Sequence, residues 1–234
     1  QVGAAYALSR SFAVGLAGGL LTGQLDRTVS RSFANDDSVS ISPFRQDLTW
    51  SERAPFISGG LRWDPARILR VEGSVTWNGT LEGSGEGDAI DFDVDLPLQL
   101  AGGIGAVLSP RLNAVIAARW DGWSSAGDAG FGGRRARDAW QIGGGLEWGS
   151  LQSATRSFPL RLGFQYGTFP FEFEGEQPRE WVASLGLGGN FAGTQFGPRA
   201  TIDAAIERGG RNVDSSALSE DFWRFTVSLS LFGQ

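Results

Sequence analysis

Residues 222–232 read FWRFTVSLSLF, and this stretch decides the fold more than any other in the chain. Its odd positions from Trp223 to Leu231 are apolar, whereas the even positions between them are Arg, Thr, Ser and Ser. Strict alternation with a period of two predicts a β-strand with one apolar face and one polar face. Such a strand is typical of the wall of a membrane β-barrel, and equally of an edge strand in a soluble β-sandwich. Only the rest of the chain can separate these two folds.

The same alternation returns along the whole chain, and it predicts about eleven strands with an all-β, antiparallel fold. Besides 222–232, the expected strands are 1–9, 11–28, 46–63, 69–78, 90–100, 112–121, 140–148, 160–166, 181–187 and 200–207. No linker, charge block or change of composition divides them, so we expect one domain over residues 1–234. No apolar run reaches the roughly 20 residues that a membrane-spanning helix needs.

The connections between these strands alternate between short turns and long polar loops. Short turns are expected at 9–10, 64–67 and 109–111, and long loops at 31–45, 80–89, 122–136, 169–178 and 209–219. Outer-membrane barrels have this asymmetry, with short turns on the periplasmic side and long loops on the extracellular side. We therefore expect the short turns at one end, together with the C-terminus, and the long loops at the other.

Tryptophan placement also favours a membrane barrel over a soluble one. Seven of the nine tryptophans fall on apolar faces near strand ends, where an aromatic girdle at the membrane surface would lie. They are Trp63, Trp77, Trp120, Trp140, Trp148, Trp181 and Trp223. The sequence therefore predicts a transmembrane antiparallel β-barrel in the bacterial outer membrane, with lipid around its wall.

Composition excludes several classes of function. The chain has no Cys, no His and no Met, and its formal net charge is −6. Without His, the usual general base and the commonest metal ligand are missing, so we expect neither an enzyme nor a cofactor. An acidic chain also lacks the basic face that nucleic-acid binding needs.

Charged residues on the polar strand faces are the candidate site, because these faces would line the lumen of the barrel. The candidates are Arg70, Glu72, Arg119, Asp121, Glu147, Arg161, Asp203, Glu207 and Arg224. They could line a polar pore or orient a substrate headgroup, or they could simply neutralise one another across strands. Three further carboxylates, Asp91, Asp93 and Asp95, would lie about 7 Å apart along a strand. No turn there would wrap a cation, so we expect no metal site.

From Leu96 onward, the order of short motifs resembles the FadL family of outer-membrane transporters for hydrophobic compounds. The motifs are Leu96-Pro97, Trp120-Asp121-Gly122-Trp123, Asp138-Ala139-Trp140 with Gly143-Gly144-Gly145, Pro159-Leu160-Arg161-Leu162-Gly163 followed by Pro170, Arg179-Glu180-Trp181 to Gly186, and Ala200-Thr201-Ile202-Asp203. The resemblance implies a fourteen-stranded barrel plugged by an N-terminal hatch. It also implies that three strands and the hatch lie upstream of Gln1, although one additional strand would equally satisfy antiparallel closure. One departure is that Gly233-Gln234 follow Phe232, whose parity places it on the polar face.

The resemblance further implies a function. It implies passive uptake of hydrophobic small molecules, such as fatty acids, through a channel in the outer membrane. The alternative is a structural or partner-binding barrel of the same type, with other outer-membrane chains as its partners in a secretion-type complex.

Overall fold

The computed structural model describes residues 1–32, 44–87, 89–126, 135–149, 158–191, 200–213 and 219–231, which form one antiparallel sheet. Its thirteen described strands are β1 (Val2–Ala7), β2 (Phe12–Arg31), β3 (Phe44–Ala66), β4 (Leu69–Asn78), β5 (Thr80–Glu86), β6 (Phe92–Asp95), β7 (Gln99–Ser109), β8 (Leu112–Asp121), β9 (Ala139–Trp148), β10 (Leu160–Thr168), β11 (Arg179–Phe191), β12 (Ala200–Asn212) and β13 (Ser219–Leu231). A short 3-10 turn, η1 (Trp123–Ala126), follows β8. Among the described residues, no helix is long and apolar enough to cross a membrane.

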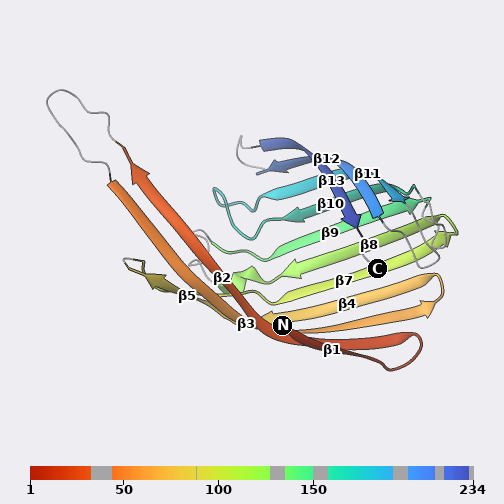
Figure 1. The fold of residues 1–234 in the computed structure, drawn as a ribbon, viewed down its shortest axis with the longest axis horizontal. Helices are drawn as coiled ribbons and strands as arrows, with labels where there is room; N and C mark the ends of the chain where they lie inside the picture. The colour runs from red at the N-terminus through yellow and green to blue at the C-terminus, as the bar shows by residue number, and fades with distance from the viewer. Residues whose placement is uncertain are drawn as a thin grey trace.

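Eleven of the strands form a continuous curved wall, as the alternation predicts. The order in the wall is β1, β2, β3, β4, β7, β8, β9, β10, β11, β12, β13, and every neighbouring pair is antiparallel (Figure 1). The other two strands, β5 and β6, form a hairpin attached to β3. Within the described residues, β1 and β13 are the two edges of the wall and do not pair with each other.

The sheet has no ordinary apolar core. Apart from prolines, the buried apolar side chains of the described residues are all Ala or Val, whereas large apolar side chains are exposed along every wall strand. Ile116 at the middle of β8 is 62% exposed, and Val227 on β13 is 76% exposed. Most of these side chains, including Ile116 and Val227, lie on one face, because the register pairs them directly across strands, as in Ile104–Ile116. Leu25 and Val115 are exceptions on the other face. A continuous exposed apolar surface of this size marks contact with lipid or with another protein.

The predicted short turns lie side by side at one end of the wall, and backbone hydrogen bonds join them. The Asp64 amide donates to the Ser11 carbonyl at 2.7 Å, and the Val107 amide donates to the Ile68 carbonyl at 2.8 Å. The Gly149 amide likewise donates to the Arg111 carbonyl at 2.8 Å. We call this end the short-turn rim. The expectation that these turns share one end is confirmed, and β13 ends at the same rim.

The long connections leave the opposite end of the wall, which we call the long-loop end. There the Arg137 amide donates to the Pro170 carbonyl at 3.1 Å, and the Glu172 amide donates to the Arg135 carbonyl at 3.2 Å. The expected loops 122–136 and 169–178 therefore meet at this end. Most of the expected loop 31–45, and parts of 122–136 and 209–219, lie outside the described residues.

One expected strand, 90–100, is wrong. The chain instead forms β6 at Phe92–Asp95, pairs it with β5, and starts the wall strand β7 only at Gln99. The break falls at Pro97, which is fully buried and whose carbonyl accepts a hydrogen bond from Asn78 Nδ2 at 2.8 Å. Proline cannot donate to a ladder, so it ends the alternation that the flanking residues suggest. The expected loop at 80–89 is also wrong over most of its length, because β5 covers Thr80–Glu86. Residues 209–212 of the expected loop 209–219 are likewise the end of strand β12.

Candidate functional site

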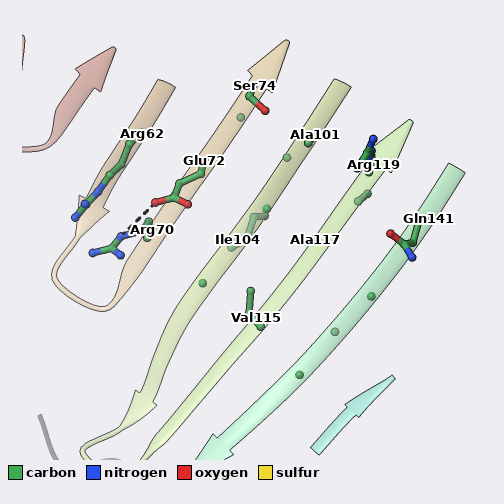
Figure 2. Close-up of a pocket in the computed structure, with 18 of the residues that line it drawn as sticks. Arg62, Arg70, Glu72, Ser74, Ala101, Ile104, Val115, Ala117, Arg119 and Gln141 are labelled. Carbon is green, nitrogen blue, oxygen red and sulfur yellow. Dashed lines mark ion pairs between the residues drawn. The ribbon is translucent and has the colours of Figure 1, made fainter. Parts of the chain in front are cut away.

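The concave face of the wall encloses a cavity of about 1130 Å³. Every wall strand from β1 to β12 contributes to its lining. Figure 2 shows part of this lining, with Arg70 and Glu72 of β4 facing each other, Arg62 of β3 beside them, and Arg119 and Gln141 from β8 and β9 farther along. We call this side of the sheet the lumen face.

The register places all nine predicted site residues on the lumen face. Arg70, Glu72, Arg119 and Glu207 line the large cavity directly, and Asp121 lines a smaller one of about 270 Å³ at the long-loop end. The remaining four are joined to that face by register and ion pairing; they are Glu147, Arg161, Asp203 and Arg224. A functional role for these residues stays a prediction.

Arg161 pairs with two acidic side chains, one on each side of it along the wall. It lies directly opposite Glu147 on β9, and its Nε is 2.7 Å from Glu147 Oε2. Its Nη1 also contacts Asp203 on β12, which requires it to reach past the intervening strand β11. The reach is possible because Gly188 lies between them, where a Cβ would stand 2.7 Å from the Asp203 carboxylate. A larger residue at position 188 would therefore obstruct the contact between Arg161 and Asp203.

The other candidates are paired in the same manner. Their ion pairs are Arg70–Asp64 (3.1 Å), Arg70–Glu72 (3.8 Å), Arg119–Asp121 (2.9 Å) and Arg224–Glu207 (3.3 Å). All these arginines are about half exposed, and such pairs contribute little stability. The arrangement neutralises the lumen face and leaves no cluster aimed at a single point. Among the described residues, no group of acidic side chains is placed to hold a metal ion.

Small residues dominate the lumen face in the middle of the wall. Ala101, Gly103, Ala117, Gly143 and Gly163 all line the cavity from β7 to β10. Several have no room for a larger group, since a Cβ on Gly163 would meet the Ser184 hydroxyl at 2.5 Å. The middle of the lumen face therefore carries mostly small side chains. It lies between the Arg161–Glu147 ion pair near the short-turn rim and the Arg119–Asp121 ion pair near the long-loop end.

The hairpin of β2 and β3 extends the lumen face beyond the wall (Figure 1), and there its character changes. Trp50 has the same strand parity as Arg62, but it is apolar and pairs with Leu25 on β2. Phe92 from β6 packs edge-on against Trp50, with ring centroids 6.4 Å apart. Trp50 Nε1 also donates to the Ile90 carbonyl at 2.9 Å. We call Leu25, Trp50, Ile90 and Phe92 the apolar apron.

The opposite face of the same hairpin is polar. Thr28 Oγ1 donates to Asp47 Oδ1 at 2.7 Å, and Thr49 Oγ1 donates to Asp26 Oδ1 at 2.9 Å. Hydrogen bonds from Arg45 and then Thr28 lower the pKa of Asp47 below its ordinary value. Sequence reasoning missed the apron, although the alternation of residues 44–54 contained the signal: the apolar residues Leu48 and Trp50 have the parity of the lumen-facing Arg62.

Comparison with known proteins supports the fold. No protein-family model matches the sequence, and neither does any curated protein. The structure of a Pseudomonas aeruginosa FadL homologue is similar, with a TM-score of 0.56 and 13% identity over 89% of this chain and 58% of that one. The CymD monoaromatic hydrocarbon channel is similar with a TM-score of 0.59 and 15% identity over 99% of this chain and 72% of that one. The described sheet thus has the fold of FadL-like channels, as the motif order suggested.

Proposed function

We propose that this chain forms the wall of a channel in the bacterial outer membrane that passes hydrophobic small molecules. The exposed apolar band on the outer face supports the membrane location. On β9, Trp140 and Trp148 lie eight residues apart on that face. At about 3.3 Å per residue and a tilt of about 40°, they bracket a height of about 20 Å, close to the roughly 25 Å band of such barrels.

The apolar apron is the single observation that carries the choice of a hydrophobic substrate. Lumen faces of aqueous pores are polar, and nothing about lipid contact requires apolar residues on the inner side above the wall. Yet Leu25 is 48% exposed and Ile90 is 83% exposed on or beside that surface. An apolar molecule arriving at the long-loop end would bury its surface there at about 25 cal/mol per Å².

The smooth small-residue wall below the apron suits the same kind of substrate. Apolar molecules gain nothing from a dense array of charges, and the lumen charges of this chain are already paired with one another. The two similar structures carry titles of a FadL homologue and a monoaromatic hydrocarbon channel. Fatty acids and small aromatic hydrocarbons are therefore the two substrate classes to compare.

The unpaired edges of the wall must be completed by further strands, from this chain or another. The eleven wall strands alternate in direction, so β1 and β13 run the same way. A fully antiparallel closure then needs an odd number of additional strands. Leaving the edges open in lipid would strand backbone N–H and C=O groups at several kcal/mol each.

A cysteine pair at Ala4 and Val227 tests the closure in the native protein. Both residues lie on the outer face of the edge strands. If three strands intervene, these positions lie at least about 15–20 Å apart, because strands are spaced by about 4.8 Å. No disulfide should form under mild oxidation. Rapid and complete cross-linking would refute an intervening segment.

Uptake by cells expressing the protein tests the function. Radiolabelled oleate and toluene should enter faster than in cells without it, whereas glucose uptake should not change. Trp50→Gln should slow hydrophobic uptake mostly at low substrate concentration. Trp77→Gln, a change of the same kind on the lipid face of β4, should have little effect. A glucose-permeable channel, or a protein that passes none of these compounds and instead purifies with secretion proteins, would refute the proposal.

A further inference from the structure

Each of the three short turns described in the structure carries an arginine close to a large exposed aliphatic residue. The three pairs are Leu8 with Arg10, Ile68 with Arg67, and Leu108 with Arg111. The aliphatic side chains are 59%, 60% and 59% exposed, and all three arginines are exposed as well. Turn geometry favours small or turn-forming residues. It does not require that each successive turn carry one arginine and one exposed aliphatic residue.

The three turns are neighbours on the short-turn rim. The hydrogen bonds from Asp64 to Ser11 and from Val107 to Ile68 join the first turn to the second and the second to the third. Successive turns are two strands apart along the wall, so their spacing is about 10 Å. The arginines therefore form a row along the rim rather than a single cluster.

The residues that the structure describes do not neutralise this row of charge. None of the three arginines makes an ion pair or a side-chain hydrogen bond with any residue that the structure describes. The carboxylates nearest this end belong to the lumen face and have their own arginine partners; they are Asp64, Glu147 and Asp203. At the long-loop end, by contrast, arginines occur with acidic partners, as in Arg53–Glu82 and Arg211–Glu180.

We propose that the short-turn rim binds the headgroups of anionic phospholipids in the adjacent leaflet. The inference rests on the membrane location proposed above, but not on transport. Each guanidinium can donate two parallel hydrogen bonds to a phosphate. Leu8 and Leu108 have the outward parity of β1 and β7, so they can enter the acyl region as interfacial anchors do. A wholly acidic protein surface would match the charge but leave these exposed aliphatic groups in water, so a lipid surface fits both observations.

Quenching of the native tryptophans by brominated lipid measures this preference. The whole protein is inserted into phosphatidylcholine vesicles that contain increasing fractions of dibrominated phosphatidylglycerol. Trp63 and Trp148 lie on the outer face near the rim and report on lipid there. The test variant is R10Q/R67Q/R111Q. The matched control is R27Q/R31Q/R135Q, which removes the same charge from exposed arginines at the long-loop end.

The wild-type protein and the control should bind phosphatidylglycerol in preference to phosphatidylcholine. The test variant should lose about fivefold in relative binding constant for each arginine removed, on the order of 100-fold for three. Replacement of the three residues by Lys should keep most of the preference, and high salt should weaken it. An unchanged preference in the test variant would overturn the proposal. An equal loss of phosphatidylglycerol preference in the control variant would also overturn it. The same holds if the test variant keeps its lipid preference and loses only the binding of a periplasmic protein.

Discussion

Replacement of Ile116 by Arg should reveal the position of the membrane more directly than any other single change. Ile116 lies on the outer face of β8, four residues from Leu112 at the short-turn rim and four from Trp120 at the long-loop end. Four residues at about 3.3 Å and a tilt of about 40° correspond to a depth of about 10 Å from either boundary. Ile116 is therefore at the middle of the apolar band.

At that depth, an outward-facing Arg costs about 2–4 kcal/mol, and the cost falls to about 0–1 kcal/mol near the interfaces. Ile116→Arg should thus lower the folding equilibrium constant by about 30- to 700-fold, at about 1.4 kcal/mol per factor of ten. The matched control is Ala117→Arg, the next residue along the strand, whose side chain points into the cavity. It should cost about 1 kcal/mol or less, because the lumen face is polar and open to water.

Reversible guanidinium unfolding in phospholipid vesicles measures both values, with tryptophan fluorescence as the signal. Leu112→Arg serves as a second control for depth, and it should cost much less than Ile116→Arg. Equal destabilisation by Ile116→Arg and Ala117→Arg would show that the two faces have the same surroundings. A larger cost for Ala117→Arg would refute the assignment of the outer face to lipid.

Three further predictions concern the lumen face and the hairpin. Gly83→Val should displace β6, because a Cβ on Gly83 would lie 2.4 Å from the Phe92 ring; fluorescence and uptake should change while unfolding of the wall does not. Arg161→Ala should cost about 1 kcal/mol or less in unfolding experiments, since exposed ion pairs contribute little, and more at low salt than at high salt because its two carboxylate partners then repel each other. Asp47 has a lowered pKa in the folded protein, so its contribution is full above the ordinary pKa of the unfolded chain and is lost as pH falls through the lower folded value. Amide exchange at the hairpin tip, corrected for intrinsic pH dependence, should therefore be constant from pH 7 to about pH 5 and rise only below about pH 4.

The wall could be predicted from sequence because its two faces are opposite in character, with exposed apolar side chains on one and paired charges on the other. Alternation of apolar and polar residues then appears in each strand separately, and a shift of one residue would expose every charge to lipid. Strand β13, whose alternation is strict, pairs with β12 over its whole length, with Phe225 beside Ile206 and Arg224 beside Glu207. Local pattern and long-range register agree there, so the prediction succeeds.

The side hairpin could not be predicted in the same way. Residues 90–100 alternate as well as any wall strand, but their partners are decided by Pro97 and by glycines that admit close contacts. Gly79 is one such position, where a Cβ would lie 2.7 Å from the Pro55 ring. Ion-pair partners were also beyond reach, because Asp203 meets Arg161 across an intervening strand. Sequence patterns report which face a residue is on, but not which distant residue it touches.

The hairpin of β2 and β3 keeps one uninterrupted register while the character of its two faces changes along its length. On its outer face, apolar residues end at Leu20 and its partner Pro55, and the next outward positions are Thr22 and Arg53. No bulge occurs between them, so the backbone continues unchanged while the environment changes. The inner face gains the apolar apron there, although Arg27 and Glu52 share the parity of Trp50. In the proposed channel, Leu20 and Pro55 would mark the outer boundary of the membrane, and an apolar molecule would meet the apron before any of the paired lumen charges.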